Sequence, residues 1–165
     1  MNRLVARSFM RIRQVAAFAA LTVGATALFG AVPARAAVLS VGSTTGPIGG
    51  YVCADVAGGN LAAGTPVNAF DCNAEGNQQF ELNGTTIYAM GGQTCLDVPG
   101  FATGSTAVVS NPCNFSVSQV WFVYKGRIIN ATGFGTCLDA TNMANGTQLV
   151  VNPCSNATSQ QWQIK

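Results

Sequence analysis

Short apolar runs separated by glycine and asparagine make up most of the chain after residue 36. Residues 121–124 are typical of these runs, which are rich in Val, Ile, Phe, Tyr and Thr, the residue types that favour strands. The pair Asn83-Gly84 separates the runs 80–82 and 86–88 and predicts a two-residue hairpin turn. No window after residue 36 has the periodicity of an amphipathic helix. The pattern therefore predicts an all-β domain built from short strands.

The first 36 residues have a different pattern. Residues 1–14 contain four arginines and no acidic residue, and residues 15–32 are apolar and uncharged. The triplet Ala34-Arg35-Ala36 has the small-x-small form of a signal-peptidase cleavage site. A basic segment, an apolar segment and a small-residue triplet are the three parts of a secretory signal peptide.

A retained membrane anchor is the alternative for this segment, because about 18 apolar residues approach the length that spans a bilayer. Its Gly, Ala and Thr content, the break at Pro33 and the cleavage triplet favour removal before Ala37. We therefore expect residues 1–36 to be a secretory signal peptide and residues 37–165 to be one secreted, extracellular domain. Secretion would bring the cysteines into an oxidising compartment, where disulfides form.

Charge and composition exclude several functions. Five of the eight basic residues lie within the first 36 positions, and all six acidic residues lie after them. The three basic residues that remain are too few for a nucleic-acid-binding surface, so we expect no nucleic acid as a partner. The sequence has no histidine, which excludes histidine-based catalytic triads and imidazole ligands for a metal.

The chain after residue 36 repeats three times. The first, third and fifth cysteines, at positions 53, 95 and 137, are spaced by 42 residues. The second, fourth and sixth, at positions 72, 113 and 154, are spaced by 41. The motif Cys-x-Asp follows the same period, beginning at Cys53, Cys95 and Cys137. The motif Gln-x-aromatic follows it too, beginning at Gln78, Gln119 and Gln160. Each unit of about 41 residues is too small to bury a core alone, so the units must share one around a pseudo-threefold axis.

The repeat also indicates how the cysteines pair. Six cysteines allow 15 connectivities. Pairing within each unit is the scheme that preserves the symmetry, and it gives Cys53-Cys72, Cys95-Cys113 and Cys137-Cys154. A zinc site would need close Cys-x-x-Cys pairs, and the sequence has none, so we expect neither a metal nor a cofactor.

Three copies of Cys-x-Asp, a second cysteine and Gln-x-Trp at this period resemble the ricin B-type (R-type) lectin domain. The resemblance covers residues 37–165, with repeats at roughly 37–90, 91–132 and 133–165. It implies a β-trefoil of about twelve short strands, six closing a barrel and three hairpins capping one end. It also implies that the aromatic residue of each Gln-x-Trp motif fills the shared core, at Phe80, Trp121 and Trp162.

The resemblance further implies where a sugar would bind. A shallow sugar site uses a carboxylate and amides for the hydroxyls and an aromatic ring for the C–H face. In the family these groups come from the Cys-x-Asp aspartate, an aromatic residue two positions before the second cysteine, and amides near both. The first repeat has the complete set, which is Asp55, Asn68, Phe70, Asn77 and Gln78.

The second and third repeats keep the aspartates, Asp97 and Asp139, but lack the ring at this position. A loop residue, Phe101 or Phe115, is the alternative source of a ring in the second repeat. Asn111 and Asn152 stand in its place, and serines precede the Gln-x-Trp glutamines. We expect these two repeats to be weaker sites. A structural role is the alternative for all three aspartates, because an aspartate at a strand end can hold a turn by hydrogen bonds to backbone N–H groups.

These observations predict a secreted, monomeric, non-catalytic lectin with its most competent site in the first repeat. Its partners would be glycans or polysaccharides, galactose-like or xylan-like. We expect it to bind no membrane after signal cleavage. The alternative is a β-trefoil protein-interaction or inhibitor domain that has lost sugar binding. A glycosidase needs two carboxylates about 5–10 Å apart, whereas symmetric aspartates would be dispersed around the axis, so we expect no enzyme activity.

Overall fold

The computed structural model describes residues 37–42, 51–133 and 135–165. The expected signal peptide, residues 1–36, lies outside the described residues. Within the described ranges, no helix is long and apolar enough to cross a membrane. The structure there consists of fourteen short strands and five single turns of 3-10 helix.

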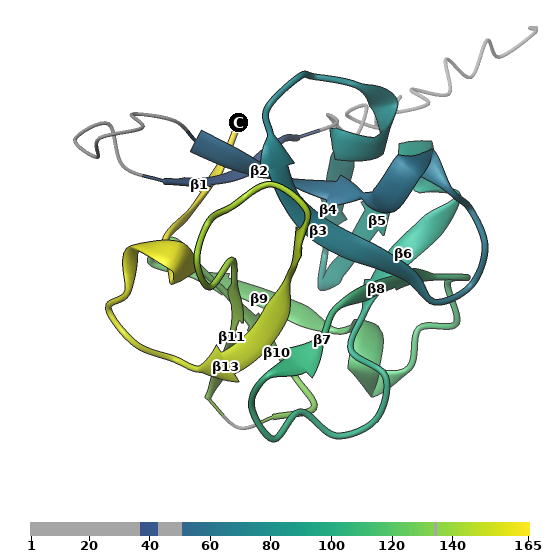
Figure 1. Cartoon of the computed structure of the whole chain (residues 1–165). Coiled ribbons are helices and arrows are strands. Elements are labelled where there is room, and N and C mark those ends of the chain that lie inside the picture. The colour runs from purple at the N-terminus through teal and green to yellow at the C-terminus, as the bar shows by residue number, and fades with distance from the viewer. Residues whose placement is uncertain (1–36, 43–50, 134) are drawn as a thin grey trace, which may run out of the picture. The chain divides into compact units, whose positions relative to one another are not determined.

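Grouped by equivalent position, the strands fall into three successive sets, each with one Cys-x-Asp motif and one Gln-x-aromatic motif (Figure 1). The first set is β1 (Leu39–Gly42), β2 (Tyr51–Val56), β3 (Thr65–Asp71) and β4 (Phe80–Asn83). The second set is β5 (Thr86–Ala89), β6 (Thr94–Asp97), β7 (Thr106–Ala107), β8 (Val109–Asn111) and β9 (Trp121–Tyr124). The third set is β10 (Arg127–Asn130), β11 (Thr136–Asp139), β12 (Thr147–Gln148), β13 (Val150–Pro153) and β14 (Trp162–Ile164). Because β7 and β8, and likewise β12 and β13, are separated by one residue, the fold has the twelve strand positions of a β-trefoil.

The 3-10 turns recur with the same period. Three of them precede the strands that begin with the aromatic residue of each Gln-x-aromatic motif: η2 (Gly76–Gln78), η4 (Val117–Gln119) and η5 (Thr158–Gln160). The other two are η1 (Ala57–Gly59) and η3 (Met90–Gly92). Each of η2, η4 and η5 ends on the motif glutamine, whose side chain is buried in all three repeats. These turns therefore place the motif glutamines at equivalent positions in the fold.

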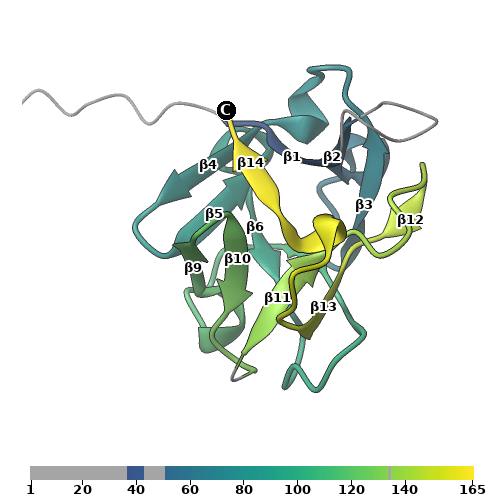
Figure 2. The same ribbon diagram turned by 90° about the vertical axis from the view of Figure 1, so that its left-hand side faces the viewer.

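Three antiparallel strand pairs join neighbouring sets: the hairpins β4–β5 and β9–β10, and the pair β14–β1. The third pair brings the last strand of the chain against the first one described, as Figure 2 shows. This pairing closes the fold, because it joins the third repeat to the first just as the two hairpins join repeats that are consecutive in the sequence.

The turn of the first hairpin differs from the sequence prediction by one residue. Asn83 pairs with Thr86, so the two-residue turn is Gly84-Thr85 and not Asn83-Gly84. The core aromatic residues explain the shift: Phe80 pairs with the residue nine positions later, as the equivalent Trp121 does in the next hairpin. The buried face of the hairpin thus sets the register of the two strands, and this register determines which two residues form the turn.

A ring of backbone hydrogen bonds surrounds the pseudo-threefold axis. The N–H of Val67 donates to the carbonyl of Val108, that of Val108 to Leu149, and that of Leu149 to Val67, at 2.8–3.1 Å. The three residues are fully buried and stand at equivalent positions, 41 residues apart. Each repeat therefore satisfies a buried backbone group of the next one, which makes the three units mutually dependent.

One hydrophobic core contains side chains from all three repeats. Phe80, Trp121 and Trp162 are buried in it, as the resemblance implies. The two tryptophan side chains also donate from Nε1 to the carbonyls of Leu96 and Leu138, at 2.9 and 2.8 Å. Phe80 has no such donor, so the core of the first repeat is held by packing alone at this point.

The three disulfides join the pairs that the repeat symmetry favoured, Cys53-Cys72, Cys95-Cys113 and Cys137-Cys154. They close loops of 19, 18 and 17 residues within single repeats. Each loop runs from a Cys-x-Asp strand to the end of the strand that pairs with it. The disulfides therefore fix the same part of every repeat, the part in which the candidate binding residues lie.

Candidate functional site

The pairing of β2 with β3 brings three of the predicted site residues onto one face. Asp55 lies directly opposite Asn68, and Cys53 lies opposite Phe70. Since paired residues share a face and alternate residues do too, Phe70 is the diagonal neighbour of Asp55, about 7–8 Å away across the strands. Phe70 is 40% exposed, Asn68 is half-buried and Asp55 is buried. The ring thus faces solvent beside a carboxylate that the fold holds in place.

Two amides hold that carboxylate. Asp55 Oδ1 accepts a hydrogen bond from Asn77 Nδ2, and Asp55 Oδ2 accepts one from Gln78 Nε2, both at 2.9 Å. Asn77 also donates to the carbonyl of Val56 at 3.3 Å. An ionised carboxylate has about four acceptor positions, so each oxygen of Asp55 keeps capacity for a further donor. The structure thus brings Asp55, Asn68, Phe70, Asn77 and Gln78 together.

Gln78 is fully buried and acts only within the protein. Besides Asp55, its Nε2 donates to the carbonyl of Asp71, and its Oε1 accepts from the N–H of Asn73. Gln119 and Gln160 make the corresponding bonds to their own aspartates, to Pro112 and Pro153 carbonyls, and to backbone N–H groups after the second cysteine. The motif glutamine therefore orients the aspartate and ties it to the loop that carries the disulfide.

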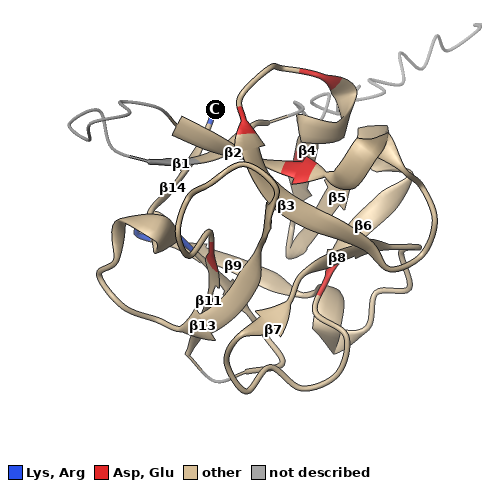
Figure 3. Ribbon diagram, in the orientation of Figure 1, with Lys and Arg blue, Asp and Glu red and all other residues tan. Residues whose placement is uncertain are grey.

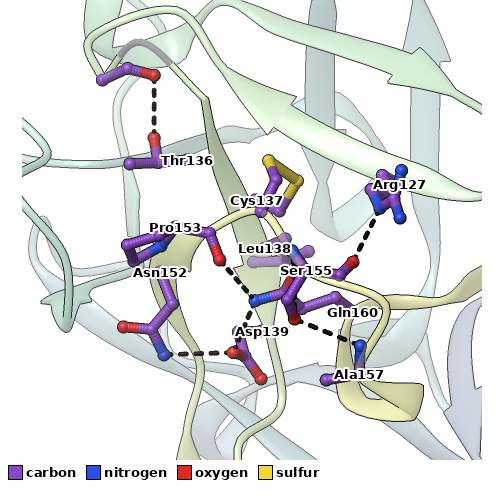
Figure 4. Close-up of a disulfide and its surroundings, with 12 residues drawn as sticks. Arg127, Thr136, Cys137, Leu138, Asp139, Asn152, Pro153, Ser155, Ala157 and Gln160 are labelled. Atoms are coloured by element: carbon purple, nitrogen blue, oxygen red, sulfur yellow. Dashed lines mark hydrogen bonds between the residues drawn. A yellow bond between two sulfur atoms is a disulfide. The ribbon is translucent and has the colours of Figure 1, made fainter.

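In the second and third repeats an asparagine occupies the place of the ring and turns onto the aspartate. Asn111 Nδ2 donates to Asp97 Oδ2 at 2.9 Å, and Asn152 Nδ2 donates to Asp139 Oδ2 at 3.1 Å. Figure 4 shows the third repeat, where Asn152 and Gln160 both point at Asp139. These two repeats therefore lack a ring at the position of Phe70, and the second repeat has exposed rings on its loops instead, at Phe101 and Phe115.

The same asparagines link each repeat to its neighbour. Asn111 Oδ1 accepts from the N–H of Gly64 at 2.6 Å, and Asn152 Oδ1 accepts from the N–H of Ser105 at 2.8 Å. Gly64 belongs to the first repeat and Ser105 to the second. Phe70 cannot make this bond, so the junction between the third and first repeats is built differently.

Asp97 and Asp139 differ in the hydrogen bonding of their Oδ1 atoms. Asp139 Oδ1 accepts from the N–H of Thr141 at 2.7 Å. Asp97 Oδ1 is, in the described part of the chain, the one buried side-chain oxygen or nitrogen without a hydrogen-bond partner. Both carboxylates are buried. Asp139 therefore has the structural role considered above for an aspartate at a strand end, since it holds the turn that follows it.

Hydrogen bonding also sets the acidity of Asp139. Burial alone would raise the pKa of this carboxyl group, but hydrogen bonds from Gln160, Asn152, Ser159 and the backbone of Thr141 outweigh it and lower the pKa below 3.8. These donors stabilise the ionised form. Asp139 therefore remains charged in the folded protein at neutral pH.

Charged side chains are sparse and dispersed in the described structure (Figure 3). The described residues include six acids and three bases, and the bases are Lys125, Arg127 and Lys165. Lys165 Nζ lies 5.0 Å from the centre of the Tyr51 ring, and Lys125 Nζ lies 5.2 Å from that of Tyr124. Within the described ranges, the hydrogen bonds to the Asp55 carboxylate come from two neutral amides and none comes from a basic side chain.

A groove of about 410 Å³ that the sequence did not predict lies beside the first repeat. It is lined by Tyr51, Val52, Asp71 and the loop residues 142–145 of the third repeat. Asp71 and Asn145 are 74 positions apart and meet there through a 2.7 Å hydrogen bond. Departure from the threefold repeat at these positions is the sequence feature that could have indicated it.

A known protein family shares the sequence pattern of this chain. The model of the ricin-type beta-trefoil lectin domain matches residues 44–162. No curated protein matches the sequence. The family match spans all three Cys-x-Asp motifs and ends on the aromatic residue of the last Gln-x-Trp motif.

Solved structures share the fold at low sequence identity. The designed threefold-symmetric protein ThreeFoil has a TM-score of 0.64 and 20% identity, over 78% of this chain and 96% of that one. The β-trefoil lectin of the Vibrio vulnificus hemolysin/cytolysin, with N-acetyl-D-lactosamine bound, has a TM-score of 0.61 and 21% identity, over 79% and 93% of the two chains. A non-toxic homologue of type II RIPs from Momordica charantia, in complex with α-methyl-D-galactoside, has a TM-score of 0.65 and 24% identity over 79% of this chain. This chain spans 47% of the Momordica protein.

Proposed function

Because the chain belongs to the ricin-type β-trefoil lectin family, we propose that it binds carbohydrate at its first repeat and does so without catalysing a reaction. Asp55 would accept hydrogen bonds from two neighbouring hydroxyls of a pyranose. The amides of Asn68 and Asn77 would add donors and acceptors, and the Phe70 ring would lie against the C–H face of the sugar. Gln78, being buried, would act by holding Asp55.

One observation carries this proposal: an oriented carboxylate and an exposed ring lie on the same face of β2 and β3. Asp55 is held from both oxygens by amides, and Phe70 is 40% exposed beside it. A prearranged acceptor loses little entropy on binding, which favours a weak polar ligand such as a sugar. The ring adds a surface on which C–H groups can stack.

The second and third repeats would bind sugar weakly at most. Their asparagines are bonded to the aspartate on one side and to the neighbouring repeat on the other. A sugar would have to displace those bonds without gaining a ring at the position of Phe70. One competent site per chain gives weak binding, so useful avidity would come from ligands that repeat the same sugar unit.

Galactose-like sugars are the first ligands to test. The Momordica structure contains α-methyl-D-galactoside and the Vibrio structure contains N-acetyl-D-lactosamine. We extend this to the present chain as a proposal, with xylan-like polysaccharides as the second class. We further propose that residues 1–36 direct export and that the mature protein acts outside the cell as a monomer.

The test is a glycan array with the wild-type protein and the variants Phe70→Ala and Asp55→Ala. We expect Phe70→Ala to lower the affinity for any bound glycan by about tenfold, since stacking on one ring is worth about 1–3 kcal/mol in related cases. Asp55→Ala should abolish detectable binding. Phe122→Ala is a matched control, because Phe122 is 49% exposed on β9, away from the site.

Thermal unfolding of each variant separates lost binding from lost folding. Phe70 is a surface residue, so its variant should fold as the wild type does. Glycan binding that persists in both Phe70→Ala and Asp55→Ala would overturn the site. Absence of any glycan ligand for the wild-type protein would favour the alternative, a protein-interaction domain.

A further inference from the structure

The junction between the third and first repeats breaks the threefold pattern on the surface of the protein. At the other two junctions, the amides of Asn111 and Asn152 accept from backbone N–H groups of the neighbouring repeat. Phe70 replaces that amide in the first repeat. The backbone pairing of β12 with β3 is kept there, and the side-chain link is made by Asn145 Nδ2, which donates to Asp71 Oδ2 at 2.7 Å.

Three polar residues at this junction have no counterpart in the other repeats. Tyr51 lies two positions before its cysteine, where the other repeats have Gln93 and Gly135. Asp71 directly precedes the second cysteine, where the others have Pro112 and Pro153. Asn145 directly precedes the loop glycine, where the others have Ala63 and Thr103. Asp71 and Asn145 are exposed and Tyr51 is half-buried, so the shared core does not require these residues.

The three residues line one groove of about 410 Å³, together with Val52, Asn142, Met143 and Ala144. That volume lies within the range of about 300–1,000 Å³ usual for small-ligand sites. Asp71 and Phe70 are consecutive in β3, so their side chains point to opposite faces of the strand. Val52, which pairs with Asp71, shares its face, whereas Tyr51 at the start of β2 is on the face of Cys53 and Asp55. The groove thus reaches around the end of the β2–β3 pair and adjoins the Asp55 site, but it shares no lining residue with that site.

The groove presents the chemistry of a hydroxyl-binding surface. Within the described residues, Asp71 Oδ1 and Asn145 Oδ1 are acceptors without a partner, and Asn142 Nδ2 is a donor without one. The hydrogen bonds that Asn142 and Asn145 already make fix their orientation: Asn142 Oδ1 accepts from the N–H of Ala144 and from Thr147 Oγ1, at 3.1 and 2.8 Å. Tyr51 and Met143 add an aromatic and an apolar surface. Acceptors, a donor and a ring together match a pyranose.

Other ligand classes fit less well. The nearest cation is Lys165, whose Nζ lies 5.0 Å from the centre of the Tyr51 ring but which does not itself line the groove, and Asp71 would repel an anion. A divalent cation such as Ca²⁺ takes six to eight oxygen ligands, and the groove has one carboxylate. A purely apolar ligand would leave the carboxylate and the amides without partners.

We infer that the groove at Tyr51, Asp71 and Asn145 is a second carbohydrate subsite that takes one neutral pyranose unit. The inference rests on the proposed function, since it assumes that the protein is a lectin. It adds a site at a junction between repeats, where the Cys-x-Asp motif takes no part. A chain with two sites on either side of the end of β3 can hold a branched or repeated glycan at two points.

The test is an NMR titration of the isotope-labelled protein, expressed from its full sequence, with methyl α-D-galactoside, N-acetyllactosamine and xylotriose separately. We expect at least one sugar to shift the backbone amide signals of Tyr51 and of residues 142–145, which line the groove. Tyr51→Ala and Asp71→Ala should each weaken that response about tenfold. Thr103→Ala, the equivalent exposed loop position in the second repeat, should leave it within twofold of the wild type.

Asp55→Ala separates this inference from the proposed function. If the groove signals still respond in that variant while those of residues 68–70 do not, both proposals are supported. Response at residues 68–70 alone in the wild type would overturn the second subsite and leave the first intact. Response at the groove alone would overturn the first site, and response at neither would overturn both.

Discussion

Three aspartates occupy equivalent positions in the repeats, yet their neighbours differ enough to give them different roles. Asp55 is held by Asn77 and Gln78 and lies beside an exposed ring. Asp139 has all its described bonds inside its own repeat, to Gln160, Asn152 and Thr141. Two exchanges account for the difference: Phe70 stands where the other repeats have an asparagine that turns onto the aspartate, and Asn77 stands where they have a serine.

The lowered pKa of Asp139 predicts an acid dependence of stability. A carboxyl group with a lower pKa in the folded protein than in the unfolded chain stabilises the fold at pH values above 3.8, its ordinary pKa. That contribution is lost as the pH falls through the lower pKa of the folded state. The difference in unfolding free energy between the wild type and Asp139→Asn should therefore shrink as the pH is lowered from 6 to about 2.

Urea unfolding at a series of pH values measures this difference. Glu75→Gln is the control, because Glu75 is exposed and its carboxylate makes no hydrogen bond to the described residues. Its unfolding free energy should follow that of the wild type at every pH. A difference for Asp139→Asn that stays constant across the series would contradict the role assigned to the Asp139 carboxylate.

At the scale of the elements, the hairpins show where sequence reasoning succeeds and where it stops. The strands were predictable because apolar residues recur with the repeat, and the three disulfides were predictable because one pairing preserves the symmetry. The turn at Gly84 was placed one residue early, since the Asn-Gly preference is a local property while the register depends on Phe80 in the core. The ring formed by Val67, Val108 and Leu149 could not be predicted, because these are ordinary apolar residues that belong to no motif.

The hairpin between β9 and β10 offers a test of turn energetics. Its two-residue turn is Lys125-Gly126, and both residues have positive φ, at 48° and 76°. A left-handed conformation costs a residue such as lysine roughly 1–2 kcal/mol, whereas asparagine adopts it more readily. Lys125→Asn should therefore raise the unfolding free energy by about 0.5 kcal/mol, less than the full strain because the contact with Tyr124 is lost.

Gly126→Ala is the opposing variant. A Cβ there would lie 3.3 Å from Gln161 Oε1 and 3.6 Å from the Trp162 carbonyl, at a positive φ. We expect it to lower the unfolding free energy by about 1 kcal/mol or more. Denaturant unfolding of both variants measures the effects, and a stabilising Gly126→Ala or a destabilising Lys125→Asn would show that the turn does not limit the stability of this hairpin.

At the scale of the described domain, the repeats cannot fold independently. The core contains side chains from all three, and the backbone ring at the axis passes a hydrogen bond from each repeat to the next. The last strand, β14, pairs with β1 and closes the structure. The groove could not be predicted from the sequence for the same reason: Asn145 meets Asp71 only after the third repeat has packed on the first.

This mutual dependence predicts one cooperative unfolding transition for the oxidised protein. Differential scanning calorimetry should give a single peak whose calorimetric and van't Hoff enthalpies agree. Replacing Cys137 and Cys154 together by alanine should lower the unfolding free energy by about 3 kcal/mol, the value expected for a loop of this length, without splitting the peak. Two separate transitions in the wild type would mean that one repeat unfolds alone.

The most direct test of the first-repeat site is a crystal structure with the tightest glycan that an array identifies. We predict that one pyranose lies with its C–H face against Phe70, with two hydroxyls within hydrogen-bond distance of the Asp55 carboxylate and a third near Asn77 or Asn68. A sugar bound elsewhere, with the Phe70 ring and Asp55 left in solvent, would contradict the assignment.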